Sequence, residues 1–403
     1  MKILLVDVNC KNSSTGKIVY DLYEKLNADG MEAAICYGRG PLVKEKNIFK
    51  FGLDFETCFH AGLSRLTGLN GCFSLFSTLR LINFVKKFKP DVIHIHELHA
   101  YFINIKKFLN FIKKLKAKIV WTFHCEYMYT GKCGHSNECD KWKIECKKCP
   151  LLHSYPKSLF FDFTKRMFGT KKNVLSNLDF TIVTPSNWLL NRVKESFLKD
   201  KKALVIHNGI DTTNLFFPRE DSEIQSLKDK YKLNGKRIVL SVAPDIMSEN
   251  KGGEKVIEIS KSFINTDVQF VLVGIKNEFS APNNVTLIKR TSNQVELAHW
   301  YSMANVFLIC SKRENFPTTC LEAVCCGTPI VGFDAGGAKE TAPYPFGKFV
   351  EYGDIDSAVK EIETFLSLKS KPFGIREFGD KNYSKKNMYL AYKQIYLENK
   401  NGK

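Results

Sequence analysis

A chain of 403 residues is longer than one ordinary hydrophobic core supports, so two domains are expected. Its 44% hydrophobic and 25% charged residues are typical of a soluble globular protein, and no apolar run reaches the ~18–20 residues of a membrane-spanning helix. The formal net charge of +18 predicts an acidic partner. Thirteen scattered cysteines and an N-terminus without a signal-peptide core together predict a cytoplasmic protein.

Short apolar runs alternate with helical patterns along the whole chain. This alternation predicts parallel sheets with helices on both faces, hence an α/β protein of two doubly wound, Rossmann-like domains that face a central cleft. The expected strands are Lys2–Val8, Ala33–Tyr37, Val92–His96, Ile119–His124, Phe180–Thr184, Ala203–His207, Ile238–Val242, Gln269–Val273, Val285–Leu287, Val306–Ile309 and Pro329–Phe333. The expected helices include Thr15–Ala28, Asn187–Leu198, Gly253–Ser262, Asn293–Ser302 and Thr319–Cys326.

The domain boundary is expected near residue 205. The first domain would cover residues 1–205 and the second residues 206–384, with Phe217–Lys236 as a polar stretch without strong periodicity. The C-terminal segment 385–403 is expected to be helical over Met388–Leu397. It could pack on either domain, and packing back on the first is one arrangement.

Lysines concentrate between Leu81 and Lys118. Within this segment, Tyr101–Lys116 has apolar residues at helical spacing with lysines between them. The simplest interpretation is a helix that packs its apolar stripe on a sheet. A compatible interpretation adds that the lysine face lies against anionic lipid headgroups.

Two carboxylates mark the segment Glu314–Glu322, whose sequence is Glu-Asn-Phe-Pro-Thr-Thr-Cys-Leu-Glu. Proline is tolerated only before or within the first turn of a helix, so Pro317 places Glu314 in the preceding loop. Glu322 is then expected near the helix start, beside unsatisfied N–H groups. Such a site suits a ligand with hydroxyls and phosphates, whereas the alternative is a capped surface helix with scattered acids.

A pair of glycines follows the next strand along the chain. Strand Pro329–Phe333 leads to Gly336 and Gly337, with Glu340 after them. Paired glycines at a strand-to-helix turn let backbone N–H groups approach a phosphate, so we expect both beside the carboxylate loop.

Four cysteines form a separate cluster in the sequence, at Cys133, Cys139, Cys146 and Cys149. Four thiolates can close a tetrahedral structural zinc site, and the surrounding lysines favour thiolate. Free loop thiols and a redox pair are the alternatives.

Together these residues resemble the retaining glycosyltransferases of family 4, which have the GT-B fold. Their signature is two glutamates separated by seven residues, then a turn like Cys326–Pro329, then Gly-Gly-x-x-Glu as at Gly336–Glu340. The resemblance covers most of the chain and is nearest to enzymes that assemble bacterial capsule, exopolysaccharide or O-antigen. Further landmarks are Pro90–His96, Trp121–His124, Thr184–Trp188, Ile206–Asp211, His96–Asn104, Thr130–Cys133 and Cys149–Pro150.

The resemblance implies a role for each of these site residues. Glu322 would hold the donor's ribose hydroxyls, and Glu314 would hold hydroxyls of the transferred sugar. Lys251 and Gly16 would lie at the diphosphate, where negative charge builds as it leaves; a solvated lysine and a turn glycine are the alternatives. The loop residues that would help to bind the donor are Asn315, Phe316, Thr318 and Thr319.

One histidine would lie on the other side of the cleft. By the resemblance, His124 would lie near the reacting sugar, whereas a half-buried structural histidine is the alternative. The family commonly follows this histidine with aspartate, and here the next residue is Cys125. Many relatives also place an arginine several residues before the Lys-Gly pair, and Ala243–Ile246 has none, so Arg237 or Lys255 would have to substitute.

These residues lead us to expect a retaining glycosyltransferase that moves a hexose from a UDP- or GDP-linked donor to a sugar acceptor, lipid-linked at the inner face of the membrane. The one Asp-x-Asp sequence, Asp354-Ile355-Asp356, does not stand out as a metal motif, so no catalytic metal is expected, and a structural zinc is the metal considered. A nucleotide-sugar epimerase of the same fold is the first alternative. A nucleic-acid-binding protein is suggested by charge alone and lacks a recognised motif, so no nucleic-acid partner is expected.

Overall fold

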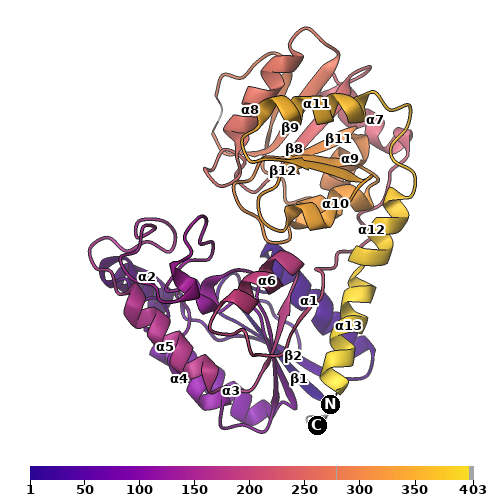
Figure 1. Ribbon diagram of the computed structural model, residues 1–403. Coiled ribbons are helices and arrows are strands. Elements are labelled where there is room, and N and C mark those ends of the chain that lie inside the picture. The colour runs from indigo at the N-terminus through magenta and orange to yellow at the C-terminus, as the bar shows by residue number, and fades with distance from the viewer. Residues whose placement is uncertain (278, 399–403) are drawn as a thin grey trace. The chain divides into compact units, whose positions relative to one another are not determined.

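The computed structural model describes residues 1–277 and 279–398 (Figure 1). The chain forms two compact units: Met1–Ile206 together with the described residues from Tyr389 onward, and His207–Met388. Each unit contains one sheet whose paired strands are all parallel, with helices packed on it. The α/β architecture of two doubly wound sheets is therefore confirmed.

The first unit is built on a seven-stranded sheet in the order β3-β2-β1-β4-β5-β6-β7. The central strands are buried on both faces, as expected of a parallel sheet covered by helices. Residues Ile3–Val6 of β1, for example, have no exposed surface. The strands are β1 (Lys2–Asp7), β2 (Glu32–Tyr37), β3 (Ile48–Lys50), β4 (Val92–Ile95), β5 (Lys118–Thr122), β6 (Thr181–Thr184) and β7 (Ala203–Val205). The helices are α1 (Ser13–Ala28), α2 (Asp54–Thr67), α3 (Leu75–Phe88), α4 (Ile105–Ile112), α5 (Thr164–Ser176) and α6 (Asn187–Glu195).

The second unit is built on a six-stranded sheet in the order β10-β9-β8-β11-β12-β13. From β8 the chain first adds β9 and β10 on one side and then β11, β12 and β13 on the other side. The carboxyl ends of β8 and β11 therefore lie side by side at a topological switch point. The strands are β8 (Arg237–Val242), β9 (Val268–Ile275), β10 (Val285–Lys289), β11 (Val306–Ile309), β12 (Ile330–Phe333) and β13 (Gly347–Val350). The helices are α7 (Asp221–Lys230), α8 (Gly253–Ser260), α9 (Gln294–Met303), α10 (Thr318–Cys325), α11 (Ile355–Leu366) and α12 (Ile375–Tyr383).

Two helices differ from the sequence-based expectation. The stretch Phe217–Lys236 contains α7, whose start is fixed by a capping box between Glu220 and Glu223. The lysine-rich helix is shorter than Tyr101–Lys116, because α4 begins only after Asn104, whose side chain accepts a hydrogen bond from the N–H of Lys107. The apolar residues of α4 are buried in the first unit's core, which confirms the packing interpretation.

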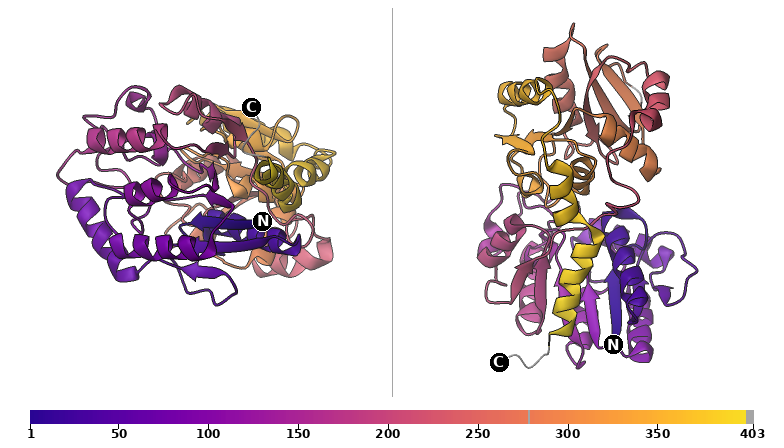
Figure 2. Two further views of the ribbon diagram at one scale, coloured as in Figure 1. Left: turned by 90° about the horizontal axis from the view of Figure 1, so that it is seen from below. Right: turned by 90° about the vertical axis from the view of Figure 1, so that its right-hand side faces the viewer.

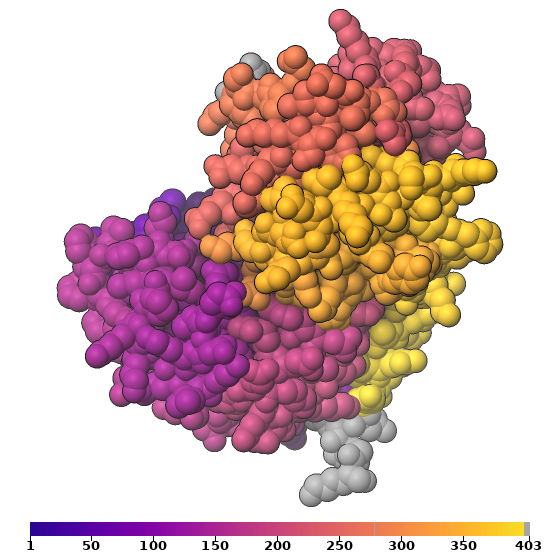
Figure 3. Space-filling model, turned by 45° about the horizontal axis from the view of Figure 1, so that its top comes forward, coloured from indigo at the N-terminus to yellow at the C-terminus, as the bar shows by residue number. Residues whose placement is uncertain are grey.

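The C-terminal helix α13 (Lys385–Leu397) starts in the second unit and continues into the first. Its part from Tyr389 onward lies along the first unit (Figure 2, right; yellow in Figure 3). There Tyr392 and Tyr396 place their hydroxyls 2.8 Å from Thr122 Oγ1 and 2.6 Å from His94 Nδ1. Residues 399–403 of the expected helical segment lie outside the described residues.

Candidate functional site

An ion pair lies at the carboxyl edge of the second unit's sheet. The Nζ atom of Lys251, in the loop after β8, lies 2.6 Å from Oε1 of Glu314, in the loop after β11. Both residues line a pocket with about 310 Å³ of empty volume, together with Ser311 and Thr319. The Glu314 side chain is 13% exposed and the Lys251 side chain 33%, so a ligand entering the pocket can reach both charges.

The backbone of Glu314 is held by the loop that follows β12. Its N–H donates to the carbonyl of Ala335, and its own carbonyl accepts from the N–H of Gly337, both at 2.9 Å. Gly336 has a φ of +95°, and a Cβ there would lie 2.2 Å from the Glu314 carbonyl oxygen. The glycine pair therefore positions Glu314. The Gly337 N–H is used in this contact, and an approach of the glycine pair to a phosphate stays a prediction.

Glu322 lies in the middle of α10 rather than at its start. Its Oε2 accepts a hydrogen bond of 2.8 Å from the hydroxyl of Tyr301, on α9. Tyr301 is fully buried. Its burial is the larger cause, and the negative charge of Glu322 the second, and together they raise the pKa of its phenol well above its usual range. The phenol therefore stays a donor and holds the carboxylate in one orientation, half-exposed toward solvent.

The other loop residues expected at the donor differ in exposure. Phe316 is 5% exposed, and its ring stacks on His207 with centroids 4.7 Å apart. Asn315 is also buried, whereas Thr318 and Thr319, the first two residues of α10, are half-exposed. Phe316 and Asn315 therefore support the loop, and the two threonines present its surface.

Of the two residues suggested in place of the missing arginine, Arg237 lies far from the pocket, whereas the role of Lys255 stays a prediction. Arg237 begins β8, at the amino edge of the sheet, where its guanidinium pairs with Asp267. Because the pocket lies at the opposite edge, the suggestion that Arg237 substitutes is wrong. Lys255 lies on α8 and pairs with Glu258.

In the first unit, His124 lies just beyond β5, beside the end of β4. Its Nε2 is 3.0 Å from His96 Nδ1, and burial lowers the pKa of the His124 imidazole. Asp7, at the end of the neighbouring β1, accepts a 3.1 Å hydrogen bond from the N–H of Glu97, and burial raises its pKa to about 6. The carboxyl ends of three adjacent strands thus bring titratable groups together.

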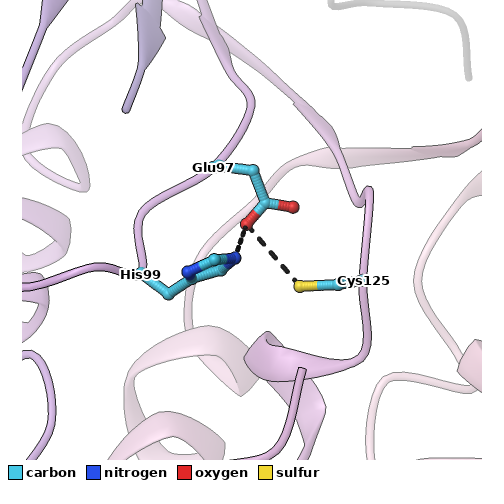
Figure 4. A group of neighbouring side chains, drawn as sticks. All are labelled: Glu97, His99 and Cys125. Carbon is cyan, nitrogen blue, oxygen red and sulfur yellow. Dashed lines mark hydrogen bonds and ion pairs between the residues drawn. The ribbon is translucent and has the colours of Figure 1, made fainter. Parts of the chain in front are cut away.

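Sequence reasoning missed the group Glu97, His99 and Cys125 (Figure 4). Oε2 of Glu97 lies 2.8 Å from Nε2 of His99 and 3.6 Å from Sγ of Cys125. Burial raises the pKa of Glu97, but the charge and hydrogen bond of His99, together with His124 and Cys125, outweigh burial and lower the pKa to about 2. The His-x-x-His spacing of His96 and His99, directly after a strand, was the available signal.

This group is also a possible metal-binding set. Its three ligand atoms lie within 4.8 Å of one another. Within residues 1–277 and 279–398, no other set of three His, Cys, Asp or Glu side chains has ligand atoms this close together. In the same part of the chain, two buried ring nitrogens, His96 Nε2 and His99 Nδ1, have no hydrogen-bond partner. Both nitrogens therefore keep an unused hydrogen-bonding capacity inside this edge.

Gly16 lies within the first turn of α1. A Cβ at this position would lie 3.3 Å from backbone and side-chain atoms of Asn9, in the loop after β1. The close approach that favours glycine here is thus between helix and loop. The expected contact of Gly16 with a diphosphate stays a prediction.

The four clustered cysteines line one pocket of the first unit, with about 300 Å³ of empty volume. Cys133 and Cys149 are in thiol–thiol contact, and Cys146 Sγ accepts a 3.1 Å hydrogen bond from the N–H of Gly131. Within the described residues, these sulfurs do not form a group with three ligand atoms inside 4.8 Å. The structure therefore gathers the cysteines without closing a tetrahedral site, and zinc binding stays a prediction.

Two sequence profiles match the chain. The profile described as Glycosyltransferase Family 4 matches residues 15–214, and the profile described as Glycosyl transferases group 1 matches residues 223–381. The matches coincide with the two units and together cover most of the sequence. Among the described residues, no helix is both long and apolar enough to cross a membrane.

Several known proteins are similar to this chain, some over nearly all of its length and others over about half of it. The colanic acid biosynthesis glycosyl transferase WcaC of Escherichia coli K12 is 23% identical, with 98% of this chain and 99% of WcaC covered. The capsular polysaccharide biosynthesis glycosyltransferase CapM of Staphylococcus aureus is 25% identical, with 47% and 53% covered. The fold matches that of Anabaena HepE, solved with UDP-glucose, at a TM-score of 0.65 and 13% identity, with 98% and 99% covered.

Proposed function

Because the chain belongs to the family 4 glycosyltransferases of the GT-B fold, we propose that it transfers a hexose from a nucleotide-sugar donor to a sugar acceptor, with retention of configuration. The observation that carries the proposal is the pocket at the carboxyl edge of β8 and β11, where Lys251 and Glu314 meet. Open α/β sheets bind their ligands at such a switch point.

The donor is a nucleoside diphosphate sugar held by the second unit. Glu322, oriented by Tyr301, accepts hydrogen bonds from the ribose hydroxyls, and Glu314 accepts them from the transferred sugar. Lys251 turns from Glu314 toward the diphosphate and neutralises the charge that develops as the sugar leaves. HepE binds UDP-glucose on the same fold, which favours a UDP-linked donor over a GDP-linked one.

The acceptor sugar is bound by the first unit. His124 and the buried ring nitrogens at the carboxyl edge of β4 and β5 offer hydrogen bonds to sugar hydroxyls. The acceptor attacks from the face that the diphosphate leaves, and the leaving phosphate takes the acceptor proton. In this mechanism Lys251 and backbone N–H dipoles stabilise the diphosphate without a catalytic metal.

The product is part of a cell-surface polysaccharide, and the acceptor is a lipid-linked oligosaccharide at the inner face of the membrane. WcaC and CapM, which are named for colanic acid and capsule biosynthesis, support this assignment. We also propose that Cys133, Cys139, Cys146 and Cys149 hold one structural zinc ion, since four thiolates are a sufficient tetrahedral ligand set.

A panel of nucleotide sugars tests the proposal directly. The donor that raises the melting temperature most is incubated with the enzyme and oligosaccharide acceptors, and the anomeric configuration of the product is read by NMR. Protection by one nucleotide sugar and transfer with retention are expected. Release of an isomerised nucleotide sugar or free sugar without any acceptor would instead identify an epimerase.

A further inference from the structure

The helix α2 exposes its apolar side chains and buries its polar ones. Phe55, Phe59 and Leu66 are 69%, 65% and 47% exposed. Its buried residues are Glu56, Thr57, His60 and Ser64. A surface helix normally turns its apolar stripe toward the core, so this arrangement is the reverse of the usual one.

Hydrogen bonds hold α2 in this reversed orientation. The Glu56 carboxylate accepts from the N–H groups of Phe76 and Ser77, at 2.9 and 2.7 Å. His60 contacts Ser74 Oγ at 2.7 Å through Nδ1 and accepts from the Gly71 N–H at 3.2 Å through Nε2. Rotating α2 to hide its phenylalanines would break these buried hydrogen bonds, so the exposure is built into the fold.

Two neighbouring segments extend the exposed apolar surface. In α3, the first turn exposes Leu75, Phe76 and Leu79, and the Phe76 N–H is bound by Glu56 of α2. The loop before α5 reaches the other end of α2, where the Leu159 N–H donates to the carbonyl of Arg65 at 2.7 Å. We define the apolar face by its exposed members: Phe55, Phe59, Leu66, Leu75, Phe76, Leu79, Leu159, Phe160 and Phe161.

Basic side chains lie beside the apolar face and outnumber its exposed carboxylates, and one of them, Lys165, pairs with Glu145. Glu56 is buried, Asp54 pairs with Lys50, and Asp162 accepts hydrogen bonds from Cys149 and Thr164. The exposed basic residues on or beside these segments are Arg65, Lys106, Lys107, Lys157, Lys165 and Arg166. The start of α4, which carries two of these lysines, is held there by the Ile105 N–H, which donates to the carbonyl of Gly71. The charge around the face therefore complements an anionic surface.

We propose that the apolar face docks the first unit on an anionic lipid bilayer, with its phenylalanines and leucines inserted among the acyl chains and the basic side chains on the headgroups. Bulky aromatic and aliphatic side chains bordered by lysine and arginine are the combination that binds membrane interfaces. Contiguous exposed apolar surface on a protein without a partner marks an interaction site. The inference rests on the proposed function in one respect, because a lipid-linked acceptor explains why the enzyme would sit at a bilayer.

The test is co-sedimentation of the full chain with vesicles of phosphatidylglycerol and phosphatidylcholine, and with vesicles of phosphatidylcholine alone. The variant Phe55→Ser/Phe59→Ser/Phe76→Ser is compared with Phe373→Ser, which removes a 99% exposed phenylalanine in the second unit. We expect the triple variant to lower the partition coefficient at least about tenfold and the control to leave it unchanged. Wild-type binding is expected to weaken with added salt and on uncharged vesicles.

Three results would overturn the inference. One is wild-type chain that stays in the supernatant with anionic vesicles, and another is equal binding by the triple variant with an unchanged melting temperature. The third is a dimer, seen by light scattering, that the triple variant abolishes, because the face would then bind a second copy. Sugar transfer to a water-soluble acceptor distinguishes membrane docking from the proposed enzymatic function. The triple variant should retain this transfer activity. A wild-type chain that binds vesicles but transfers no sugar would contradict the proposed function alone.

Discussion

Lys251 and Glu314, 63 positions apart in the chain, form a 2.6 Å ion pair at the carboxyl edge of one sheet. Each side chain stabilises the charge of the other while the pocket holds no ligand. If the donor binds as proposed, a diphosphate competes for Lys251 and a sugar hydroxyl for Glu314, and donor binding exchanges one set of charged contacts for another. The pair keeps both side chains in place before a ligand arrives.

Replacing Lys251 by Met should lower kcat/KM by about 10²- to 10³-fold, since a group that stabilises developing charge is worth roughly 3–4 kcal/mol. Lys276→Met is the control, because Lys276 forms an ion pair of similar length but greater exposure with Asp245. Initial rates over a range of donor concentrations measure the effect. Glu314→Ala is expected to abolish transfer, and wild-type turnover in either site variant would contradict the assignment.

Glu322→Gln should weaken nucleotide binding about tenfold, because the amide replaces one acceptor of the ribose hydroxyls. Tyr301→Phe removes the hydroxyl that orients this carboxylate and should produce a smaller effect in the same direction. Isothermal titration with the nucleoside diphosphate, which lacks the sugar, isolates this contact. If both variants bind the nucleotide as tightly as the wild type, Glu322 does not hold the ribose.

Buried neutral histidines should make the first unit sensitive to acid. Burial lowers the pKa of His94 to about 3, whereas an unfolded histidine titrates near 6.5. Below pH 6.5 the unfolded chain therefore binds the extra proton, and His94 costs up to about 1.4 kcal/mol of stability per pH unit down to its folded pKa. Asp7, with a pKa raised to about 6, acts oppositely between pH 6 and 3.8, because there the folded state holds the proton.

The measurement is the free energy of unfolding in urea between pH 7 and 4. His94→Gln should reduce its slope against pH, even if the lost contacts with Tyr396 and Thr122 also lower stability at pH 7. His153→Gln, at an exposed position of the same unit, should leave the slope unchanged. A wild-type slope in His94→Gln would show that this imidazole is not the group being titrated.

The protein purified under reducing conditions should contain one zinc ion per chain, bound in the four-cysteine pocket, as measured by elemental analysis. Cys149→Ser should remove this zinc, and the long loop around it should become sensitive to protease, because metal binding contributes to folding in such sites. Cys58→Ser, an exposed thiol of α2, should retain zinc. Loss of metal in Cys125→Ser but not in Cys149→Ser would assign the ion to Glu97, His99 and Cys125 instead.

The core strands of both sheets could be predicted from the sequence, but two of the edge strands could not. Strands such as Val306–Ile309 are predicted exactly, because a doubly buried strand is a continuous apolar run bounded by polar residues. The edge strands β3 and β13 were missed, since they are short and partly exposed and carry no such run. The helix α7 was missed because one buried residue, Ile224, leaves little periodicity to detect.

The candidate site was predictable where one segment carries the signal. Glu314 and Lys251 were both identified, yet no local pattern reveals that they pair, because their contact depends on the adjacency of β8 and β11. The same limit applies to Glu97 and Cys125, which come from the ends of two neighbouring strands. For α2, periodicity alone would turn Phe55 and Phe59 inward, and only the buried partners of Glu56 and His60 reverse that choice.

The path of α13 has a consequence for synthesis of the chain. The strands of the first unit's sheet are all made by Val205, but Thr122 and His94 can contact Tyr392 and Tyr396 only after α13 has been made. While the second unit is being translated, the Thr122 hydroxyl and the His94 imidazole therefore contact each other, at 2.8 Å, but lack their tyrosine partners. Nascent chains ending near Ser384 should be aggregation-prone, and packing of α13 from Tyr389 onward would complete the folding of the first unit.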